Sequence, residues 1–399
     1  MTDAFLRYQA QTSPYPLLLD IERAEGLYLY GRDGRRYADM ISGLAVCNVG
    51  HRHPRVVAAI REQVDRYLHV MPYGEFVQGP QVRLARKLAT LMPAGLDATY
   101  FVNSGAEAIE GALKLAKRYT GRRGLVACHK SYHGSTHGAL SVTGNATKRD
   151  AFEPLLPGVR FVDFGEAEQL DAITEETAAV LIETVQGDAG VRIPPPDYFR
   201  AVRARCDEVG ALMILDEIQT GLGRTGRMFA FEHFGVVPDV VCLAKALGGG
   251  MPMGAFVARR DVMHCLSHEP MLGHITTFGG HPVSCAAGLA SVSVIEEDLL
   301  ADVERKGRLL GEGLRHPLVR EVRQIGLMFA VDLPSAEVTY EVVSRCLERG
   351  VLTFYFLSCP ASFRLAPPLV IGEGEIEEVC AVIRGVFDEV GWALRAGDF

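Results

Sequence analysis

The sequence predicts an α/β protein with a mainly parallel sheet covered by helices, plus a smaller α+β domain. In the middle of the chain, short apolar runs alternate with amphipathic segments, which is typical of strands that helices bury on both faces. The predicted strands are Leu125–Cys128, Val159–Phe161, Ala178–Ile182, Leu212–Leu215, Val240–Leu243 and Ala255–Ala258. The predicted helices are Ser104–Tyr119, Tyr198–Val209 and a run after Pro282.

Three further segments indicate the rest of the fold. Arg23–Asp39, with its Gly-Arg-Asp-Gly turn, predicts a β-hairpin. From about residue 300, helical segments rich in Arg and Glu surround Gly326–Leu333, which has the pattern of a strand. This change in pattern predicts the smaller domain near the C-terminus. The aromatic run Phe354–Phe356 could line a pocket, but it favours a core strand of that domain because aromatic residues favour strands.

Composition and charge argue against several kinds of partner. The 399 residues carry a formal net charge of −8, whereas nucleic acids and anionic membranes select basic surfaces. The nine cysteines are scattered without a C-x-x-C pair, so we expect reduced, core-filling thiols and no metal site. The N-terminus lacks the pattern of a signal peptide, and no stretch approaches the roughly 18 apolar residues of a membrane span. We therefore expect a cytoplasmic protein.

The segment Asn103-Ser104-Gly105-Ala106-Glu107 predicts a helix start that could hold a phosphate. Ser104 is a good N-cap residue, and Glu107 three residues later completes a capping box. Gly105 has no side chain, so a ligand can approach the backbone closely. Amides at such a helix start bind phosphate with help from the helix dipole. Taken alone, the segment favours a capped helix without a ligand over a phosphate site.

Charged residues follow two of the predicted strands. Asp216 follows Leu212–Leu215, and Lys245 comes shortly after Val240–Leu243 and just before three glycines at 248–250. Ligands of open α/β sheets bind beyond the carboxyl ends of the strands, and a buried carboxylate there needs a cationic partner. A lysine in this setting can lose its proton and form an imine. The alternatives are a helix cap or a solvated turn for Asp216, and for Lys245 a side chain that reaches water from a strand end.

One glycine motif points elsewhere but lacks the right context. Gly221–Gly226 matches G-x-G-x-x-G, the dinucleotide fingerprint. The residues that follow do not clearly open a long helix, and the acid expected about 20 residues further on is missing. A nicotinamide-dependent dehydrogenase is therefore disfavoured.

In their order along the chain, these segments resemble the class III aminotransferases of pyridoxal-5′-phosphate (PLP) fold type I. That family includes ornithine, acetylornithine and 4-aminobutyrate aminotransferases. Further matches are SYHGSTHGALSVTGN, ETVQGDAGV, LDEIQTGLGRTGRMF, TTFGGHPVSCAAG and FRLAPPLVI, so the resemblance covers nearly the whole chain. It implies a large PLP-binding domain with a seven-stranded sheet at residues 56–290. An N-terminal segment, 1–55, is expected to join a C-terminal small domain, 291–399.

The resemblance also implies a role for each matching residue. Lys245 would hold PLP as a Schiff base, and Asp216 would pair with the pyridine nitrogen. Ser104, Gly105 and Ala106 match the turn that holds the phosphate, and Tyr132, next to His133, matches the aromatic residue that stacks on the ring. Glu183 matches a glutamate that supports this network, and Gln219 matches a glutamine near the ring hydroxyl. Thr277 matches a threonine that reaches the cofactor of the neighbouring subunit. Thr277 thereby implies a homodimer with shared active sites.

Two departures from the family concern the substrate. The ornithine, acetylornithine and 4-aminobutyrate enzymes usually carry a carboxylate-binding arginine where this chain has Ser135, which weakens the case for those three donors. In the family, the glutamate of a Gln-Gly-Glu motif pairs with the arginine of an Arg-x-x-Pro-Pro-Leu motif. In this chain Asp188 takes the place of that glutamate, and Arg364 matches the arginine. We expect Arg364 to bind the carboxylate of a keto acid, with Asp188 as its neutralising partner. A purely structural ion pair is the alternative.

The leading prediction is a PLP-dependent aminotransferase with a ping-pong mechanism through Lys245. It would move an amino group from an ω-amino acid, diamine or amine to a keto acid such as 2-oxoglutarate or pyruvate. The pocket wall is expected to include Val46, Cys47 and Tyr73. Decarboxylation or an aminomutase or epimerase reaction on the same fold is the nearest alternative. A non-catalytic scaffold is disfavoured because Lys245 and Asp216 are both present.

Overall fold

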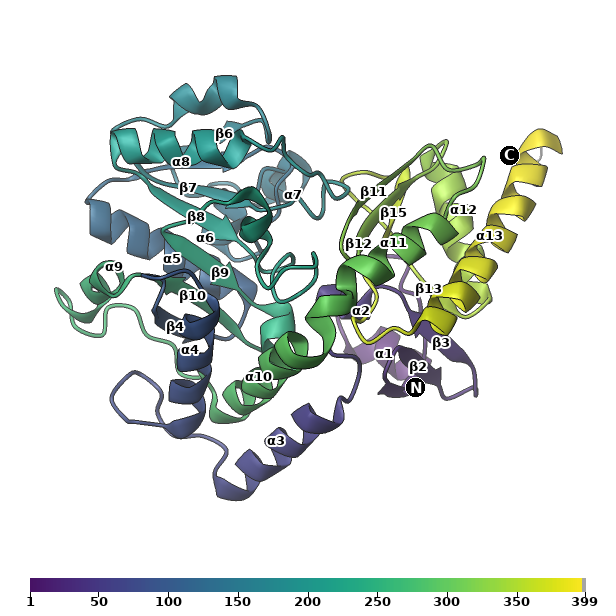
Figure 1. Cartoon of the computed structure of the whole chain (residues 1–399), viewed down its shortest axis with the longest axis horizontal. Helices are drawn as coiled ribbons and strands as arrows, with labels where there is room; N and C mark the ends of the chain where they lie inside the picture. Colours follow the sequence, from purple (N-terminus) through teal and green to yellow (C-terminus); the bar gives the residue numbers. More distant parts are fainter. Residues whose placement is uncertain (397–399) are drawn as a thin grey trace.

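The structure, a computed structural model, describes residues 1–396 and has a large α/β part beside a smaller part (Figure 1). A run of helices connects the two parts (Figure 1). It begins with α10 (Pro282–Val294) and ends with α11 (Val303–Gly313). A π-helical turn at Ile295–Leu299 and a short 3₁₀ turn lie between them. The predicted helix after Pro282 is therefore confirmed, and it extends into this connection.

The large part is built on a seven-stranded sheet in the order β4-β10-β9-β8-β7-β5-β6. The strands are β4 (Ala98–Val102), β5 (Gly124–Cys128), β6 (Val159–Val162), β7 (Thr177–Glu183), β8 (Leu212–Asp216), β9 (Val240–Leu243) and β10 (Gly254–Ala258). All neighbouring pairs from β6 to β9 are parallel, whereas β10 runs antiparallel to β4 and β9. The predicted mainly parallel sheet is confirmed, and it also contains β4, which the sequence did not predict as a strand.

Both faces of this sheet are buried, which explains the continuous apolar runs. Along β8, Met213 and Leu215 belong to one apolar cluster, whereas Leu212 and Ile214 belong to another. Helix α5 (Gly105–Thr120) packs into the second cluster and α8 (Tyr198–Val209) into the first. Successive side chains of a strand point to opposite faces, so each face buries half of the strand.

The smaller part contains two four-stranded sheets. One has the order β1-β2-β3-β13, and the other has the order β11-β12-β15-β14. The strands of the first are β1 (Ile21–Glu25), β2 (Tyr28–Gly31), β3 (Arg36–Asp39) and β13 (Val351–Leu352). Those of the second are β11 (Glu321–Ile325), β12 (Met328–Asp332), β14 (Phe354–Tyr355) and β15 (Ser362–Leu365). The predicted strand within Gly326–Leu333 is β12, and the aromatic run forms β14.

The N-terminal hairpin prediction needs correction. The segment forms two successive antiparallel pairs, β1 with β2 and β2 with β3. The predicted Gly-Arg-Asp-Gly turn joins β2 to β3, and a second turn at Gly26, with φ 56°, joins β1 to β2. Glycine adopts such positive φ values at no steric cost. Strand β3 also pairs in parallel with β13, so segments from both ends of the chain share a sheet. The domain boundaries at residues 55/56 and 290/291 stay a prediction.

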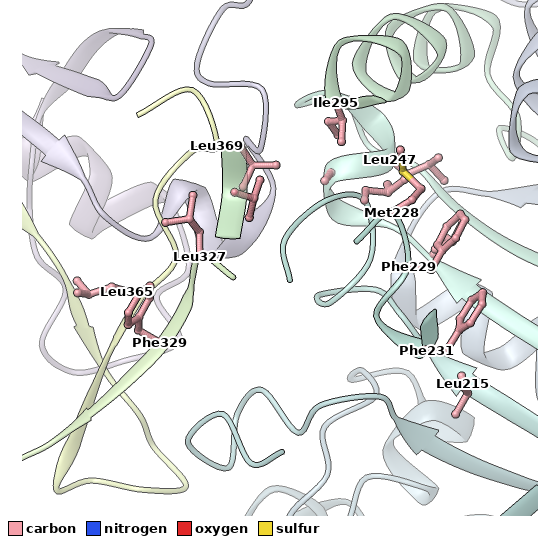
Figure 2. Packing of buried hydrophobic residues seen from close by; sticks show 14 of the residues in the cluster. Leu215, Met228, Phe229, Phe231, Leu247, Ile295, Leu327, Phe329, Leu365 and Leu369 are labelled. Atoms are coloured by element: carbon pink, nitrogen blue, oxygen red, sulfur yellow. The ribbon is translucent and has the colours of Figure 1, made fainter. Parts of the chain in front are cut away.

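The two parts pack through one apolar cluster, which Figure 2 shows from close by. Phe229 and Ile295 lie on the side of the large part, and Leu327 and Leu369 lie on the other side. A Cβ atom on Gly223, with φ 84°, would lie 2.8 Å from Cγ2 of Ile295 and 2.9 Å from Cδ1 of Leu369. The glycine motif at 221–226 thus forms a tight turn at this junction, and no long helix follows it.

The remaining helices are short or lie on the outside of the two parts. They are α1 (Thr2–Tyr8), α2 (Ser42–Ala45), α3 (Pro54–Arg66), α4 (Gly79–Leu91), α6 (His137–Ser141), α7 (Ala146–Arg149), α9 (Arg260–His264), α12 (Ala336–Glu348) and α13 (Glu373–Ala396). Within residues 1–396, no helix combines the length and the apolar character needed to cross a bilayer.

Candidate active site

A pocket of about 570 Å³ lies at the carboxyl ends of three neighbouring parallel strands. Glu183 ends β7, Asp216 ends β8, and Lys245 follows β9 after Ala244. Glu183 and Asp216 are direct partners in the register of the sheet. All three side chains line the pocket. This is the sheet edge at which open α/β proteins bind ligands.

Most of the predicted site residues meet in this pocket. The predicted residues that line it are Val46, Ser104, Gly105, Ala106, Tyr132, His133, Glu183, Asp188, Asp216, Gln219 and Lys245. Four other predicted residues do not line it. Arg364 lies beside it on β15 and contacts Asp188, whereas Thr277 is exposed on the surface. Cys47 and Tyr73 were expected in the pocket wall, but neither is among the lining residues.

Lys245 lies in a strained turn. Its φ of 47° is in the left-handed region, which a residue with a Cβ atom rarely adopts. Burial lowers the pKa of the Lys245 amine below its usual range, although Asp216 and Glu183 oppose this effect. The shift increases the neutral fraction of the amine, which is the form that reacts with a carbonyl group.

Two contacts fix the Asp216 carboxylate at the floor of the pocket. Its Oδ2 lies 2.7 Å from Nδ1 of His133, and its Oδ1 accepts a hydrogen bond from the backbone N–H of Ile218 at 3.0 Å. The carboxyl group is 5% exposed, so these contacts replace most of its hydration. Nε2 of His133 is buried without a hydrogen-bond partner among the described residues. The pair therefore presents a fixed carboxylate at the pocket floor.

Glu183 ties two loops to the end of β7. Its Oε1 accepts the backbone N–H of Tyr132 at 2.9 Å, and its Oε2 accepts that of Gly187 at 2.8 Å. Burial and the neighbouring carboxylate of Asp216 raise the pKa of Glu183 to about 7, although His133 and the two N–H groups oppose the shift. Glu183 thus fixes the loop that carries Tyr132, whose ring lines the pocket.

The helix start at Ser104 has the predicted cap with one difference. The Oγ of Ser104 accepts the N–H of Glu107 at 3.2 Å. The carboxylate of Glu107 reaches back to the backbone N–H of Asn103, at 2.7 Å, rather than to that of Ser104. The positive end of the α5 dipole therefore faces the pocket at Gly105, as the sequence predicted.

Asp188 sits in a cluster of charged and polar groups at another wall of the pocket. Its Oδ2 accepts hydrogen bonds from Nζ of Lys148 at 2.6 Å and from Oγ of Ser358 at 2.7 Å. Its Oδ1 accepts a longer one, 3.4 Å, from Nη2 of Arg364. The guanidinium of Arg364 lies over the ring of Phe356, 4.2 Å from its centre. The structure thus brings Asp188 and Arg364 together, and it adds Lys148.

Several residues that line the pocket are not among the predicted site residues. The lining also contains Asn103, Gly134, Ser135, Val185, Ile218, Thr220, Ala244, Gly250, Met251, Pro252 and Met253. Most of them are next to predicted residues or to the glycines after Lys245, so adjacency could have identified them. Lys148 lies on a four-residue helix and carries no pattern that would have identified it.

Known proteins resemble this chain over almost its whole length. A family model described as Aminotransferase class-III matches residues 8–387. An acetylornithine aminotransferase from Methanocaldococcus jannaschii is 41% identical over 381 residues, which cover 92% of each chain. Another from Methanopyrus kandleri is 45% identical over 378 residues, 93% of each chain.

Solved structures give the same result. The ornithine aminotransferase from Toxoplasma gondii ME49 has a TM-score of 0.91 and 31% identity, and the match covers 98% of this chain and 94% of that one. A transaminase from the marine bacterium Virgibacillus has a TM-score of 0.93 and 30% identity, and the match covers 98% and 99% of the two chains.

Proposed function

Because this chain belongs to the class III aminotransferases, we propose that the pocket at the ends of β7, β8 and β9 is its active site and that Lys245 is the cofactor-binding lysine. The chain is a PLP-dependent transaminase that transfers an amino group to a keto acid, and it has the architecture of PLP fold type I. The observation that carries the site assignment is the meeting of Lys245, Asp216 and Glu183 in one pocket.

The described residues fit the cofactor. A Cβ atom on Gly105 would lie 2.9 Å from Cδ1 of Ile218, another lining residue, so a side chain there would crowd the pocket lining. The amides at this helix start suit a phosphate. Asp216 offers a fixed anion for a protonated ring nitrogen, and the neutral form of Lys245 suits a carbonyl carbon. An anion site, an anionic partner and a reactive amine thus line one cavity.

Each residue then has a chemical task. When bound, PLP supplies an electron sink for the electron pair released at the substrate carbon. We assign phosphate binding to Ser104, Gly105 and Ala106. Asp216 keeps the proton on the ring nitrogen, supported by His133.

The remaining tasks concern the ring and the moving proton. Lys245 transfers the proton between the substrate carbon and the cofactor carbon, which requires a lowered pKa. Tyr132 would stack on the ring, and Glu183 holds the backbone of that tyrosine. Gln219, whose carboxamide lies against Gly187, would contact the ring hydroxyl.

The wall of the pocket at Asp188, which we call the substrate end, supports a carboxylate-binding role for Arg364. Its guanidinium makes one long hydrogen bond to Asp188, and its Nε is buried without a partner among the described residues. Arginine binds a carboxylate with two parallel N–H groups. We propose that Arg364 binds the keto acid, that Asp188 neutralises it when the donor has no carboxylate there, and that Val46 lines the substrate end.

The donor is proposed to be an ω-amino acid, a diamine or an amine. The two relatives that are acetylornithine aminotransferases by name make N-acetylornithine the first donor to test. Ser135 argues against this donor, because the enzymes with that activity usually carry a carboxylate-binding arginine at this position. The acceptor is proposed to be 2-oxoglutarate or pyruvate.

We further propose a homodimer in which Thr277 reaches the cofactor of the partner subunit. Thr277 is surrounded along the chain by exposed apolar side chains, with Met271 77%, Leu272 52%, Ile275 46% and Phe278 55% exposed. Apolar patches of this kind mark interaction surfaces. A cytoplasmic location is the last part of the proposal.

The test is an absorbance scan of the purified protein with PLP, before and after adding donors without an acceptor. The expected result is a visible band of protein-bound PLP that the true donor removes while its oxo product accumulates. Lys245→Ala should lack this response. A band that disappears with release of CO₂ would instead indicate decarboxylation. If no band forms, the assignment of Lys245 is wrong.

A further inference from the structure

We infer that Lys148 is a second carboxylate-binding cation of the active site and makes a keto acid with two carboxylates the preferred acceptor. The inference rests on the proposed function, because it concerns the same pocket. It assigns a specificity role to a residue that neither the sequence motifs nor the pocket lining singles out.

The ammonium group of Lys148 lies between two residues that line the pocket. Its Nζ is 2.6 Å from Oδ2 of Asp188 and 4.6 Å from the centre of the Tyr132 ring. Ammonium groups are attracted to aromatic faces at this distance. The Lys148 side chain is 25% exposed, so water or a ligand can reach it. The cation therefore adjoins the substrate end of the pocket through Asp188 and Tyr132, although Lys148 is not itself among the lining residues.

The tyrosine that Lys148 contacts also contacts a neutral polar residue of the pocket. The hydroxyl of Tyr132 is 3.2 Å from Oγ of Ser135, and Ser135 lines the pocket. Ser135 can offer a hydrogen bond but no charge. Lys148, on the ring of the same tyrosine, supplies a positive charge to the region where position 135 has none.

Lys148 and Arg364 share a single carboxylate, that of Asp188. The carboxylate has Lys148 and Ser358 on one oxygen and Arg364 on the other. Although burial alone would raise the pKa of Asp188, hydrogen bonds from Lys148 and Ser358 outweigh it and lower the pKa. Asp188 is therefore ionised at neutral pH. Two cations against one anion leave this wall with a net positive charge.

Both cations retain donors for a ligand. Lysine has three N–H donors and arginine has five. Among the described residues, Asp188 is the only hydrogen-bond acceptor for each of them. Both charged groups contact the carboxylate of Asp188. The distance between them is therefore at most the width of one carboxylate plus the lengths of two hydrogen bonds. A short dicarboxylate can place one end on each cation, whereas a monocarboxylate can use only one.

A structural role for Lys148 makes a different prediction. If Lys148 only held Asp188 in place, its loss would change the binding of monocarboxylates and dicarboxylates alike, because both would meet the same displaced Asp188. The difference between the two ligand classes therefore separates the two roles.

The experiment compares the wild type with Lys148→Met and Lys148→Arg, each loaded with PLP. Calorimetry measures the binding of glutarate and of butyrate, which have two carboxylates and one carboxylate and no oxo group to react. Kinetics then give KM and kcat for 2-oxoglutarate and pyruvate. The matched control is Lys117→Met, which removes a half-buried lysine on α5 that does not line the pocket.

The inference predicts that Lys148→Met weakens glutarate binding and raises KM for 2-oxoglutarate by roughly tenfold to a hundredfold, the effect of losing one charged hydrogen bond. The affinity for butyrate, the KM for pyruvate and kcat should change by less than about twofold, well below that effect. Lys148→Arg should keep most of the glutarate affinity, because it keeps the charge. If Lys148→Met does not fold, as judged by thermal unfolding, Lys148→Gln replaces it.

Parallel changes for both ligand classes, or no change for either, would overturn the inference. So would a wild type that binds glutarate no more tightly than butyrate. The binding measurement does not depend on turnover. A wild type that binds glutarate through Lys148 but transfers no amino group from any donor would therefore refute the proposed function and leave the role of Lys148 standing.

Discussion

Replacing Asp188 with asparagine tests how the substrate end of the pocket handles carboxylates. Asn keeps the size of the side chain and one oxygen acceptor but removes the negative charge. Arg364 would then lose the only carboxylate that contacts it among the described residues. An incoming keto acid would no longer compete with Asp188, so it should bind more tightly. A donor without a carboxylate should bind and react less well, because it would leave a buried arginine uncompensated.

The structure sets the size of this effect. The Asp188 and Arg364 side chains are only 16% and 13% exposed, but they meet through one hydrogen bond of 3.4 Å, which is long for a charged pair. We therefore take the low end of the range for charged hydrogen bonds, about 1.5 kcal/mol. This corresponds to a decrease of about tenfold in KM for the keto acid. For a donor without a carboxylate, kcat/KM should fall by a similar factor.

Steady-state kinetics with each substrate varied separately measure both effects. The matched control is Asp332→Asn, because Asp332 pairs with Arg323 at 2.5 and 2.6 Å in the second small sheet and outside the pocket. That control should lower stability and leave both Michaelis constants unchanged. A KM for the keto acid that stays the same or rises in Asp188→Asn would refute the competition between Asp188 and the substrate.

Three further predictions concern the cofactor side. Lys245→Ala should lower the rate of amino transfer by about 10²–10⁴-fold, the usual contribution of a proton-transferring side chain, and stopped-flow absorbance would detect it. Gly105→Ala should weaken PLP binding, measured by titrating the apoprotein, because the new methyl group would lie 2.9 Å from Cδ1 of Ile218. Glu183 has a native pKa of about 7 against 4.5 in the unfolded chain, so its protonated form is favoured by folding. The free energy of unfolding should therefore fall as pH rises from about 4.5 to about 7, by up to about 3 kcal/mol. Glu183→Gln should remove that slope in urea titrations of the apoprotein.

The sequence predicted the centre of the large sheet well because burial on both faces leaves a continuous apolar run. Strand β4 was missed because four of its five residues are only partly buried, so the run is weaker. The N-terminal strands were predicted as one hairpin because the turn at Gly26 resembles an ordinary glycine within a strand. The first of these failures reflects partial burial, since a partly buried strand gives a weaker apolar pattern than one buried on both faces.

The residues of the site also fall into two groups, those that the sequence could predict and those that it could not. Lys245 and Asp216 could be predicted because a charged residue directly after a buried strand is costly and therefore informative. Lys148 could not be predicted, because only the fold brings it to Asp188, which lies 40 residues further along the chain. The link between Asp188 and Arg364 came from the family resemblance, since 176 residues separate them.

This difference has a physical consequence for specificity. The cofactor side of the pocket depends on the register of neighbouring strands in one sheet, so Lys245, Asp216 and Glu183 keep their spacing as long as the sheet is intact. The substrate side combines a loop after β7 and helix α7 of the large part with Arg364 on β15 of the smaller part. Its geometry therefore depends on the packing between the two parts. A core substitution at their junction can thus change which acid is accepted while the spacing of the cofactor residues stays the same.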